Sequence, residues 1–285
     1  MAEAEKYVIK KIFNNNVILA EKNSAAGELI FVGKGIGFSR KAGDKVLRTE
    51  LKIDKEFSPI KGEKRENYIQ LLEEVDSKVI GVTEEIIAMV SSELGEELNQ
   101  HIRIGLTDHI AFSLKRIQDG IEVANPFLAE TRTLYNEEYR LAEKAVQMLS
   151  ERFELEIPES EIGFITFHIH GARNEKGISK TLKNTTVIKE LVTEVENELG
   201  RQLSYESLNY ARLVNHLRFA LERIETNSSN PNPLLENIKE NFSFSFEIAK
   251  KLAKIIEEKF DSKVPEAEKG YLALHLQRLK RDLEL

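Results

Sequence analysis

An internal repeat covers most of this 285-residue chain and limits its fold more than any other feature. Residues 108–117 align with residues 215–224 at an offset of 107, and the two blocks share His, Phe, Leu, Arg and Ile at the same places. The same offset carries further residues onto one another: Asn125-Pro126 onto Asn232-Pro233, Ala142 onto Ala249, Phe153 onto Phe260, and Pro158-Glu159 onto Pro265-Glu266. Upstream, Glu93-Leu94-Gly95 meets Glu198-Leu199-Gly200 at an offset of 105. The repeat predicts two tandem domains of about 105 residues each.

Both copies of the repeat have the residue spacing of α-helices. Beyond residue 65, apolar residues recur at intervals of three and four over segments of helical length, as in Tyr139, Ala142 and Val146. We therefore expect an all-α helical-bundle body, with one domain at 67–173 and a second at 174–285.

Residues 1–58 have a different pattern, which predicts β-strands. Short runs rich in Val, Ile and Phe lie within residues 7–32, and turn-forming residues separate them. A glycine-rich segment, 33–37, follows. We expect a small antiparallel sheet in a domain of residues 1–58, and its thin core and open edges favour dimerisation. Residues 59–66, with Pro, Gly and charges but no periodicity, are expected to form a linker.

Charge and cysteine content narrow the classes of function. Residues 1–58 carry 11 Lys and Arg against 8 Asp and Glu, a net charge of +3, whereas the remainder carries −10. A basic unit ahead of an acidic body favours an anionic partner for the first domain. The absence of cysteine excludes disulfides, thiolate metal sites and cysteine nucleophiles. No apolar run reaches the ~18 residues of a membrane span, so we expect a cytoplasmic protein without membrane insertion.

Four of the six histidines lie at equivalent positions of the repeat. The separation along the chain between His109 and His168 is the same as that between His216 and His275. An arginine follows the first histidine of each pair two helical turns later, on the same helix face, and arginine suits an anion better than a dry core. Two explanations fit this pattern. The histidines carry out the same chemistry in both copies, or they are core residues that the duplication preserved.

Metal binding and nucleophilic catalysis find little support. His168 and His170 leave a helix about 200° apart, whereas a metal needs its ligands on one side. The chain lacks a Gly-x-Ser-x-Gly elbow and a Walker A sequence, and residues 33–37 lack the spacing of a dinucleotide loop. We therefore expect no metal, no cofactor and no catalytic residue.

The first domain contains the residue types that nucleic-acid surfaces use. Lysines and arginines neutralise phosphates, asparagines contact base edges, and an aromatic ring stacks on an unpaired base. The candidates are Lys10, Lys11, Asn14, Asn15, Asn16, Lys34, Phe38, Arg40 and Lys41. Asparagine triplets are also ordinary turn formers, and Phe38 also suits a core, so a structural role remains open beside nucleic-acid binding.

Two motifs and the doubled histidine domain together resemble the BglG/SacY family of bacterial transcriptional antiterminators, and within it most the regulators of glucose phosphotransferase genes. The motifs are residues 11–18 (KIFNNNVI) and 32–38 (VGKGIGF), with Gly43-Asp44 after them. The resemblance implies a dimeric four-stranded sheet that binds an RNA hairpin overlapping a terminator, so that transcription continues into a sugar-uptake gene. It also implies that the two helical domains are phosphotransferase regulation domains.

The same resemblance implies roles for individual residues in both parts of the chain. RNA contacts are implied for Lys11, Asn14, Asn16, Gly33, Lys34 and Phe38, and phosphorylation for His109, His168, His216 and His275. The family often has arginine in place of Lys34, which lacks the planar fork for a bidentate phosphate contact. The implied phosphate donors are HPr and a sugar-specific enzyme II of the phosphotransferase system. Phosphate adds about −2 charge to a near-neutral ring, so the implied switch is electrostatic.

Two alternatives differ in class from this non-enzymatic RNA-binding antiterminator. One is a helical phosphocarrier that relays phosphate through His109 or His216, while the β unit only dimerises. The other is a DNA-binding activator with the same regulation domains, which requires a helix-turn-helix that the β-rich segment 1–58 does not offer. Binding assays with hairpin, single-stranded and duplex nucleic acids discriminate between the RNA and DNA hypotheses.

Overall fold

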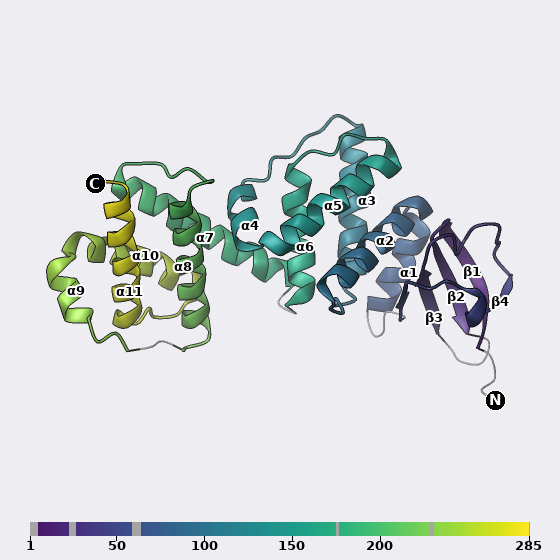
Figure 1. The fold of residues 1–285 in the computed structure, drawn as a ribbon, viewed down its shortest axis with the longest axis horizontal. Helices are drawn as coiled ribbons and strands as arrows, with labels where there is room; N and C mark the ends of the chain where they lie inside the picture. The colour runs from purple at the N-terminus through teal and green to yellow at the C-terminus, as the bar shows by residue number, and fades with distance from the viewer. Residues whose placement is uncertain (1–4, 23–26, 59–63, 175–176, 229–230, 285) are drawn as a thin grey trace. The chain divides into compact units, whose positions relative to one another are not determined.

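The structure is a computed structural model that describes residues 5–22, 27–58, 64–174, 177–228 and 231–284. Within these residues, five β-strands come first in the chain and α-helices follow (Figure 1). The strands are β1 (Lys6–Asn14), β2 (Val17–Lys22), β3 (Glu28–Val32), β4 (Lys45–Leu47) and β5 (Lys55–Phe57). The helices are α1 (Lys64–Glu74), α2 (Ser77–Leu94), α3 (Ile102–Gln118), α4 (Leu128–Leu134), α5 (Asn136–Phe153), α6 (Ser160–Arg173), α7 (Gly177–Leu199), α8 (Leu208–Glu225), α9 (Leu235–Asn241), α10 (Ser243–Phe260) and α11 (Glu266–Asp282).

The strands form one antiparallel sheet in the order β4-β1-β2-β3-β5, which confirms the predicted fold class. The family resemblance implied four strands, whereas the described residues hold five. The two outer strands, β4 and β5, are only three residues long. Short outer strands limit the unpaired backbone that a sheet edge presents to other chains.

Both faces of this sheet are buried, as the unbroken apolar run of β2 requires. Alternate side chains of a strand point to opposite faces, so Val17 and Leu19 pack with helix residues while Ile18 and Ala20 pack on the other side. The second face is covered by residues from the segment after β3, including Ile36 and Leu51. Helix α2 contacts β1, β2 and β3 on the first face.

Helix α2 begins and ends at residues with suitable capping chemistry. Asp76 precedes α2 and its side chain accepts a hydrogen bond from the Lys78 N–H, and Gly95 ends this helix in the left-handed conformation. Of the predicted linker, 59–66, residues 59–63 lie outside the described residues and 64–66 begin α1. No helix in the described part of the chain has the length and apolar character needed to span a bilayer.

The repeat found in the sequence recurs as a set of side-chain contacts. Three ion pairs occupy equivalent positions in the two copies: Glu85–Arg152 and Glu190–Lys259, Glu93–Lys144 and Glu198–Lys251, and Arg116–Glu161 and Arg223–Glu268. A hydrogen bond also recurs, because the Asn125 and Asn232 side chains donate to the carbonyls of Ser160 and Ala267. The two helical domains therefore share a common framework of contacts.

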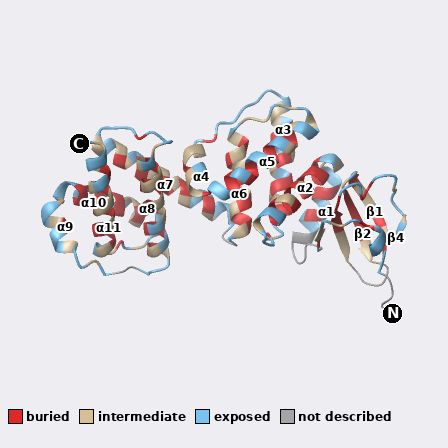
Figure 2. Cartoon of the chain, in the orientation of Figure 1, coloured by how far each residue is buried: buried red, intermediate tan, exposed pale blue. Residues whose placement is uncertain are grey.

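Backbone contacts divide the chain into two compact units, each with its own buried core (Figure 2). The first contains residues 1–125 and 137–178, and the second contains 126–136 and 179–285. Helix α4 therefore groups with the second unit, where Tyr210 donates to Glu130 at 3.0 Å. The domain boundaries 1–58, 59–66, 67–173 and 174–285 stay a prediction. We refer to the two helical repeats as the first and second regulation domains.

Candidate functional site

The first histidine pair lies between α3 and α6. The ring centroids of His109 and His168 are 5.1 Å apart. His109 Nε2 lies 3.0 Å from Oε2 of Glu161, which precedes His168 by two turns of α6. Ser113 donates to the same carboxylate oxygen at 2.8 Å, and Arg116 contacts the other oxygen. Three side chains of α3 thus converge on one buried carboxylate.

The electrostatics of this pair fix two protonation states. Burial alone would raise the pKa of Glu161, but hydrogen bonds from His109 and Ser113 and the charge of Arg116 hold this pKa below its ordinary value. Burial, together with the neighbouring His109, lowers the pKa of His168 to about 3. At neutral pH Glu161 is therefore ionised, and His168 is a neutral imidazole with a lone pair on one nitrogen.

The second histidine pair lies between α8 and α11, and its rings are closer together. His216 and His275 stack with 3.3 Å between ring centroids and 16° between ring planes. Glu268, the counterpart of Glu161, accepts hydrogen bonds of 2.9 and 2.7 Å from Arg223. Within the described residues, no hydrogen bond or ion pair joins Glu268 to His216. Glu161 contacts a histidine, a serine and an arginine of α3. Of these three contacts, only the one with the arginine recurs at Glu268 among the described residues of the second copy.

Burial and positive charge lower the pKa values of both rings in the second pair. For His216 the causes are burial and then the charges of Arg278, Arg223 and Arg212. For His275 the causes are burial, His216 and then two of these arginines, and they lower its pKa to about 4. Both rings are therefore neutral at pH 7, so each has a nitrogen lone pair available to an electrophile.

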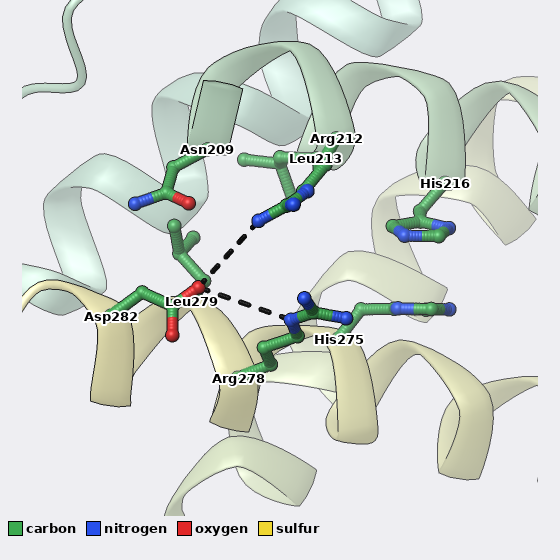
Figure 3. Close-up of a pocket in the computed structure, with 8 residues that line it drawn as sticks. All are labelled: Asn209, Arg212, Leu213, His216, His275, Arg278, Leu279 and Asp282. Atoms are coloured by element: carbon green, nitrogen blue, oxygen red, sulfur yellow. Dashed lines mark ion pairs between the residues drawn. The ribbon is translucent and has the colours of Figure 1, made fainter. Parts of the chain in front are cut away.

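A pocket opens beside the second pair (Figure 3). Figure 3 shows the two histidine rings towards one end and Asp282 towards the other, with the guanidinium groups of Arg212 and Arg278 between them. Oδ2 of Asp282 lies 3.9 Å from a nitrogen of each arginine. That separation exceeds hydrogen-bond distance, so both guanidinium groups are held only weakly by this carboxylate.

The remaining two histidines lie outside the pairs. His170 points away from His168, as the helix geometry predicts, and its Nδ1 lies 2.9 Å from Oε1 of Glu138 on α5. His101 is exposed at the N-terminal end of α3. In the part of the chain that the structure describes, no group of three or more His, Asp or Glu side chains could hold a metal ion.

The asparagine turn between β1 and β2 organises the glycine-rich segment beside it. The side-chain oxygen of Asn14 accepts a hydrogen bond from the Asn16 N–H at 2.7 Å, and that of Asn16 accepts one from the Gly35 N–H at 2.9 Å. A Cβ atom on Gly33 would lie 1.9 Å from the carbonyl oxygen of Lys52, so the close approach requires glycine. Asn14, Asn16 and Gly33 therefore have structural roles in this loop region.

Three of the six candidate RNA-contact residues are also bonded to helices of the first regulation domain. The amide nitrogens of Asn14 and Asn16 donate to the two carboxylate oxygens of Glu85 on α2, at 2.8 and 2.9 Å. Lys11 donates to the carbonyl oxygen of Leu72 near the end of α1 at 2.7 Å. By contrast, the side chains of Lys34 and Phe38 are exposed, Phe38 by 67%.

Helix α2 has a surface that fits Asn14 closely. A Cβ atom on Gly81, one turn before Glu85, would lie 2.4 Å from the amide nitrogen of Asn14. The equivalent residues of the second copy are Thr186 and Glu190, and Glu190 contacts Lys259 at 2.8 Å. The ion pair of this glutamate is thus common to both copies, whereas the asparagine contacts occur only in the first.

Sequence reasoning missed several residues of these sites. Glu161 and Glu268 were not among the predicted site residues, although each lies two turns before a histidine on the same helix face. Sequence reasoning missed Arg212 and Arg278 because it followed residues shared by both copies, and these two occur in one copy only. The signal that could have found them is a comparison of the copies for charged residues that differ.

Family models match most of this chain, and a solved structure matches 59% of it. The CAT RNA binding domain matches residues 7–66, and the PRD domain matches twice, at residues 84–172 and 189–279. The crystal structure of GlcT CAT-PRDI is 40% identical over the aligned part, with a TM-score of 0.50, and covers 59% of this chain and 99% of that one.

Curated relatives match over the full chain as well. The PtsGHI operon antiterminator of Bacillus subtilis is 38% identical and covers 96% of this chain and 97% of its own length. Transcription antiterminator LicT of Bacillus subtilis and Protein GlcT of Staphylococcus saprophyticus are each 33% identical and cover 95% of this chain, with 98% and 96% of their own lengths. The resemblance drawn from the sequence motifs is confirmed: the chain belongs to the family of transcription antiterminators that join a CAT RNA-binding domain to two PRD regulation domains.

Proposed function

We propose that this antiterminator binds an RNA hairpin that overlaps a terminator and so allows transcription of a sugar phosphotransferase transport gene, with glucose as the sugar. The names of two relatives, the PtsGHI operon antiterminator and Protein GlcT, support the glucose-type assignment. The observation that carries the proposal is the match of a CAT domain and two PRD domains in one chain, each PRD domain holding a histidine pair in contact.

The histidines His109, His168, His216 and His275 are the proposed phosphorylation sites. HPr and a sugar-specific enzyme II are the proposed donors, and the phosphate acts as a regulatory mark that is not passed on, so the protein is not an enzyme. The neutral state of His168, His216 and His275 supports this assignment, because only a neutral imidazole has the lone pair that takes up phosphorus. We place the protein in the cytoplasm as a homodimer.

The proposed RNA-binding face consists of Lys11, Asn14, Asn16, Gly33, Lys34 and Phe38. Exposure of Lys34 and Phe38 beside the asparagine turn supports it, since a cation and a stacking ring are available to a looped RNA. The contacts of Asn14 and Asn16 with Glu85 imply that RNA must replace this carboxylate to reach the two amides.

The test is hairpin binding by the full chain and by its Asn16→Ala variant. If Asn16 contacts bases or loop shape, the variant should lose more affinity for the cognate hairpin than for a scrambled one, by about tenfold. Affinity of the parent chain should fall with salt in proportion to the phosphates neutralised. Fluorescence anisotropy with labelled RNA measures both.

Asn237→Ala is the control, because it removes an exposed asparagine side chain on α9, outside the proposed RNA-binding face. It should leave the discrimination between the two hairpins within twofold of the parent. Equal losses on both hairpins in the Asn16 variant would show that Asn16 only shapes the turn. Absence of hairpin binding by the unphosphorylated and the phosphorylated parent would contradict the antiterminator proposal and favour the phosphocarrier alternative.

A further inference from the structure

The two copies of the repeat differ in charge at two positions that flank the histidine pairs. Arg212 in the second copy corresponds to Gly105 in the first, and Arg278 corresponds to Gly171, both at the offset of 107. The shared framework of ion pairs shows that these positions are structurally equivalent. The second pair therefore has two guanidinium groups that the first pair lacks.

The positions of these arginines place both charges at the histidine rings. Arg212 lies one turn before His216 on α8, and Arg278 lies one turn after His275 on α11, so each shares a helix face with a histidine. All four side chains line the pocket of Figure 3. In the first copy, a Cβ atom at residue 105 would lie 3.4 Å from Nδ1 of His168, which confirms that this helix position borders the pair.

The two guanidinium groups have hydrogen-bonding capacity that the protein leaves unused. Within the described residues their nearest acidic partner is Asp282, at 3.9 Å from each, and neither makes a side-chain hydrogen bond. Arginine carries five N–H donors in a planar fork that matches the oxygens of a phosphoryl group. The third arginine, Arg223, is already committed to Glu268 by two hydrogen bonds.

We propose that Arg212 and Arg278 are positioning residues that hold a phosphoryl group on His216 and that make the second histidine pair the better phosphoryl acceptor of the two. The inference rests on the proposed phosphorylation and adds which residues select the site. A dianion on His216 meets two guanidinium groups whose only ion pair among the described residues is the 3.9 Å contact with Asp282. A dianion on His109 meets the ionised Glu161, 3.0 Å from the ring nitrogen.

The chemical step needs no further reactant besides the phosphoryl donor. The lone pair of a neutral His216 nitrogen attacks phosphorus, a nitrogen–phosphorus bond forms, and the bond from phosphorus to the donor's leaving group breaks. With phosphoramidate as the donor, the protonated amino group of the donor leaves as ammonia and keeps its own protons. The two arginines bind the equatorial oxygens, on which charge accumulates during transfer.

The experiment treats the full chain with phosphoramidate and follows labelling of each histidine by peptide mass spectrometry at alkaline pH and by ³¹P NMR. We expect His216 to label faster than His109. Arg212→Ala and Arg278→Ala should each slow labelling of His216 by about 3- to 10-fold, because each removes one charged donor that is partly exposed. Arg212→Lys, which keeps the charge, should recover part of the rate.

Two further variants separate this role from a structural one. Arg281→Ala removes a nearby exposed arginine that also contacts Asp282 but does not line the pocket, and labelling should stay within twofold of the parent. Gly105→Arg transplants the charge of Arg212 into the first copy, where the space beside His168 admits a Cβ atom at ordinary contact distance. It should accelerate labelling of the first pair.

Labelling of His216 at the parent rate in both Arg212→Ala and Arg278→Ala would overturn the inference, and so would an equal loss in Arg281→Ala. Preferred labelling of His109 in the parent would also overturn it. RNA-hairpin binding, measured on the same unlabelled preparations, reports on the proposed function separately, because none of these arginines belongs to the proposed RNA-binding face.

Discussion

In the first regulation domain a histidine lies 3.0 Å from a carboxylate, whereas in the second the equivalent histidine borders a pocket lined by two arginines. Three ion pairs and one asparagine hydrogen bond are the same in both domains. The helical framework therefore stayed constant while the charges around the reactive rings changed. A duplicated domain can thus keep its fold while the charges beside one pair of residues differ between the copies.

The two domains also differ in what their cores hold. In the first, Arg103 and Glu84 form a fully buried ion pair, with Tyr68 donating to the same carboxylate. The residue equivalent to Arg103 in the second domain is Tyr210, a neutral side chain that donates to Glu130. Both cores therefore hold a buried carboxylate, but its partner is a charged arginine in the first and a neutral hydroxyl in the second, and losing a charged partner costs more.

The largest effect is expected from Arg103→Met, which keeps an apolar stem but leaves Glu84 buried without its charge partner. We expect a loss of about 3–5 kcal/mol in the free energy of unfolding. Tyr210→Phe, the matched change in the second domain, should cost only about 1.5–3 kcal/mol, the range for the loss of one hydrogen bond to a charged group. Hydrogen exchange of α3 and α8, followed by mass spectrometry, measures the two domains separately.

A second substitution sharpens this result. Glu84→Gln combined with Arg103→Met removes the stranded charge and should recover part of the lost stability. A loss below about 1 kcal/mol for Arg103→Met alone would mean that the ion pair is not the source of the difference between the two cores.

The next effect concerns acid stability. The folded pKa of His168 lies at about 3, below the ordinary value of 6.5, so between these values the unfolded chain binds a proton that the folded chain does not. Stability should therefore fall as the pH drops below 6.5, with this residue contributing a slope of up to ~1.4 kcal/mol per pH unit. His168→Gln should flatten the dependence of unfolding free energy on pH.

Urea titrations at pH 5.0, 5.5, 6.0 and 7.0 measure the unfolding free energy. These pH values lie above the range in which Glu161, whose pKa is lowered, takes up a proton. His275→Gln should flatten the same window by about as much, because its folded pKa, about 4, also lies below pH 5. An unchanged slope in both variants would show that neither ring is held neutral by folding.

A smaller effect, about tenfold in activity, is expected from the regulatory switch at His109. If phosphate on the first domain opposes the active dimer, His109→Ala should keep antitermination on without the sugar, and His109→Asp, an anionic mimic, should lower it. The same pair of changes at His216 should have less effect on glucose-type control. A terminator-read-through reporter in cells with and without the sugar measures all four.

Divergence between the Ala and Asp variants is the informative outcome. If both variants of His109 fold and give the same read-through, His109 is a core residue of the framework and carries no signal. A larger response at His216 than at His109 would reverse the assigned order of the two domains.

The smallest effect is expected at the contact between α2 and the asparagine turn. Glu85→Ala frees the amides of Asn14 and Asn16, so RNA affinity of the full chain should rise by about threefold. Glu190→Ala removes the equivalent ion pair of the second domain, which has no asparagine partners, and should leave RNA affinity unchanged. Anisotropy titrations compare the two directly, and equal effects would show that Glu85 acts only through its ion pair with Arg152.

The sequence allowed the fold to be predicted because its signals are local or repeated. Strand alternation and helix spacing are read over a few residues, and the offset of 107 pointed to the two histidine pairs. The contact of Glu85 with Asn14 was not predictable in this way, since it joins residues 71 apart that no periodicity relates. The residue pattern indicated the strands within residues 7–32, whereas β4 and β5, with three residues each, leave almost no pattern.

Gly81 shows how little separates the two copies of this duplicated domain. Its missing Cβ is what lets Asn14 approach α2, and the other copy has threonine at this position. One methyl group, as in Gly81→Ala, would collide with the amide of Asn14, so this side chain would have to move away from α2. Substitutions that enlarge this residue by one carbon at a time therefore weaken the contact between the RNA-binding sheet and α2 in steps. They do so without altering any charged group or proposed phosphorylation site.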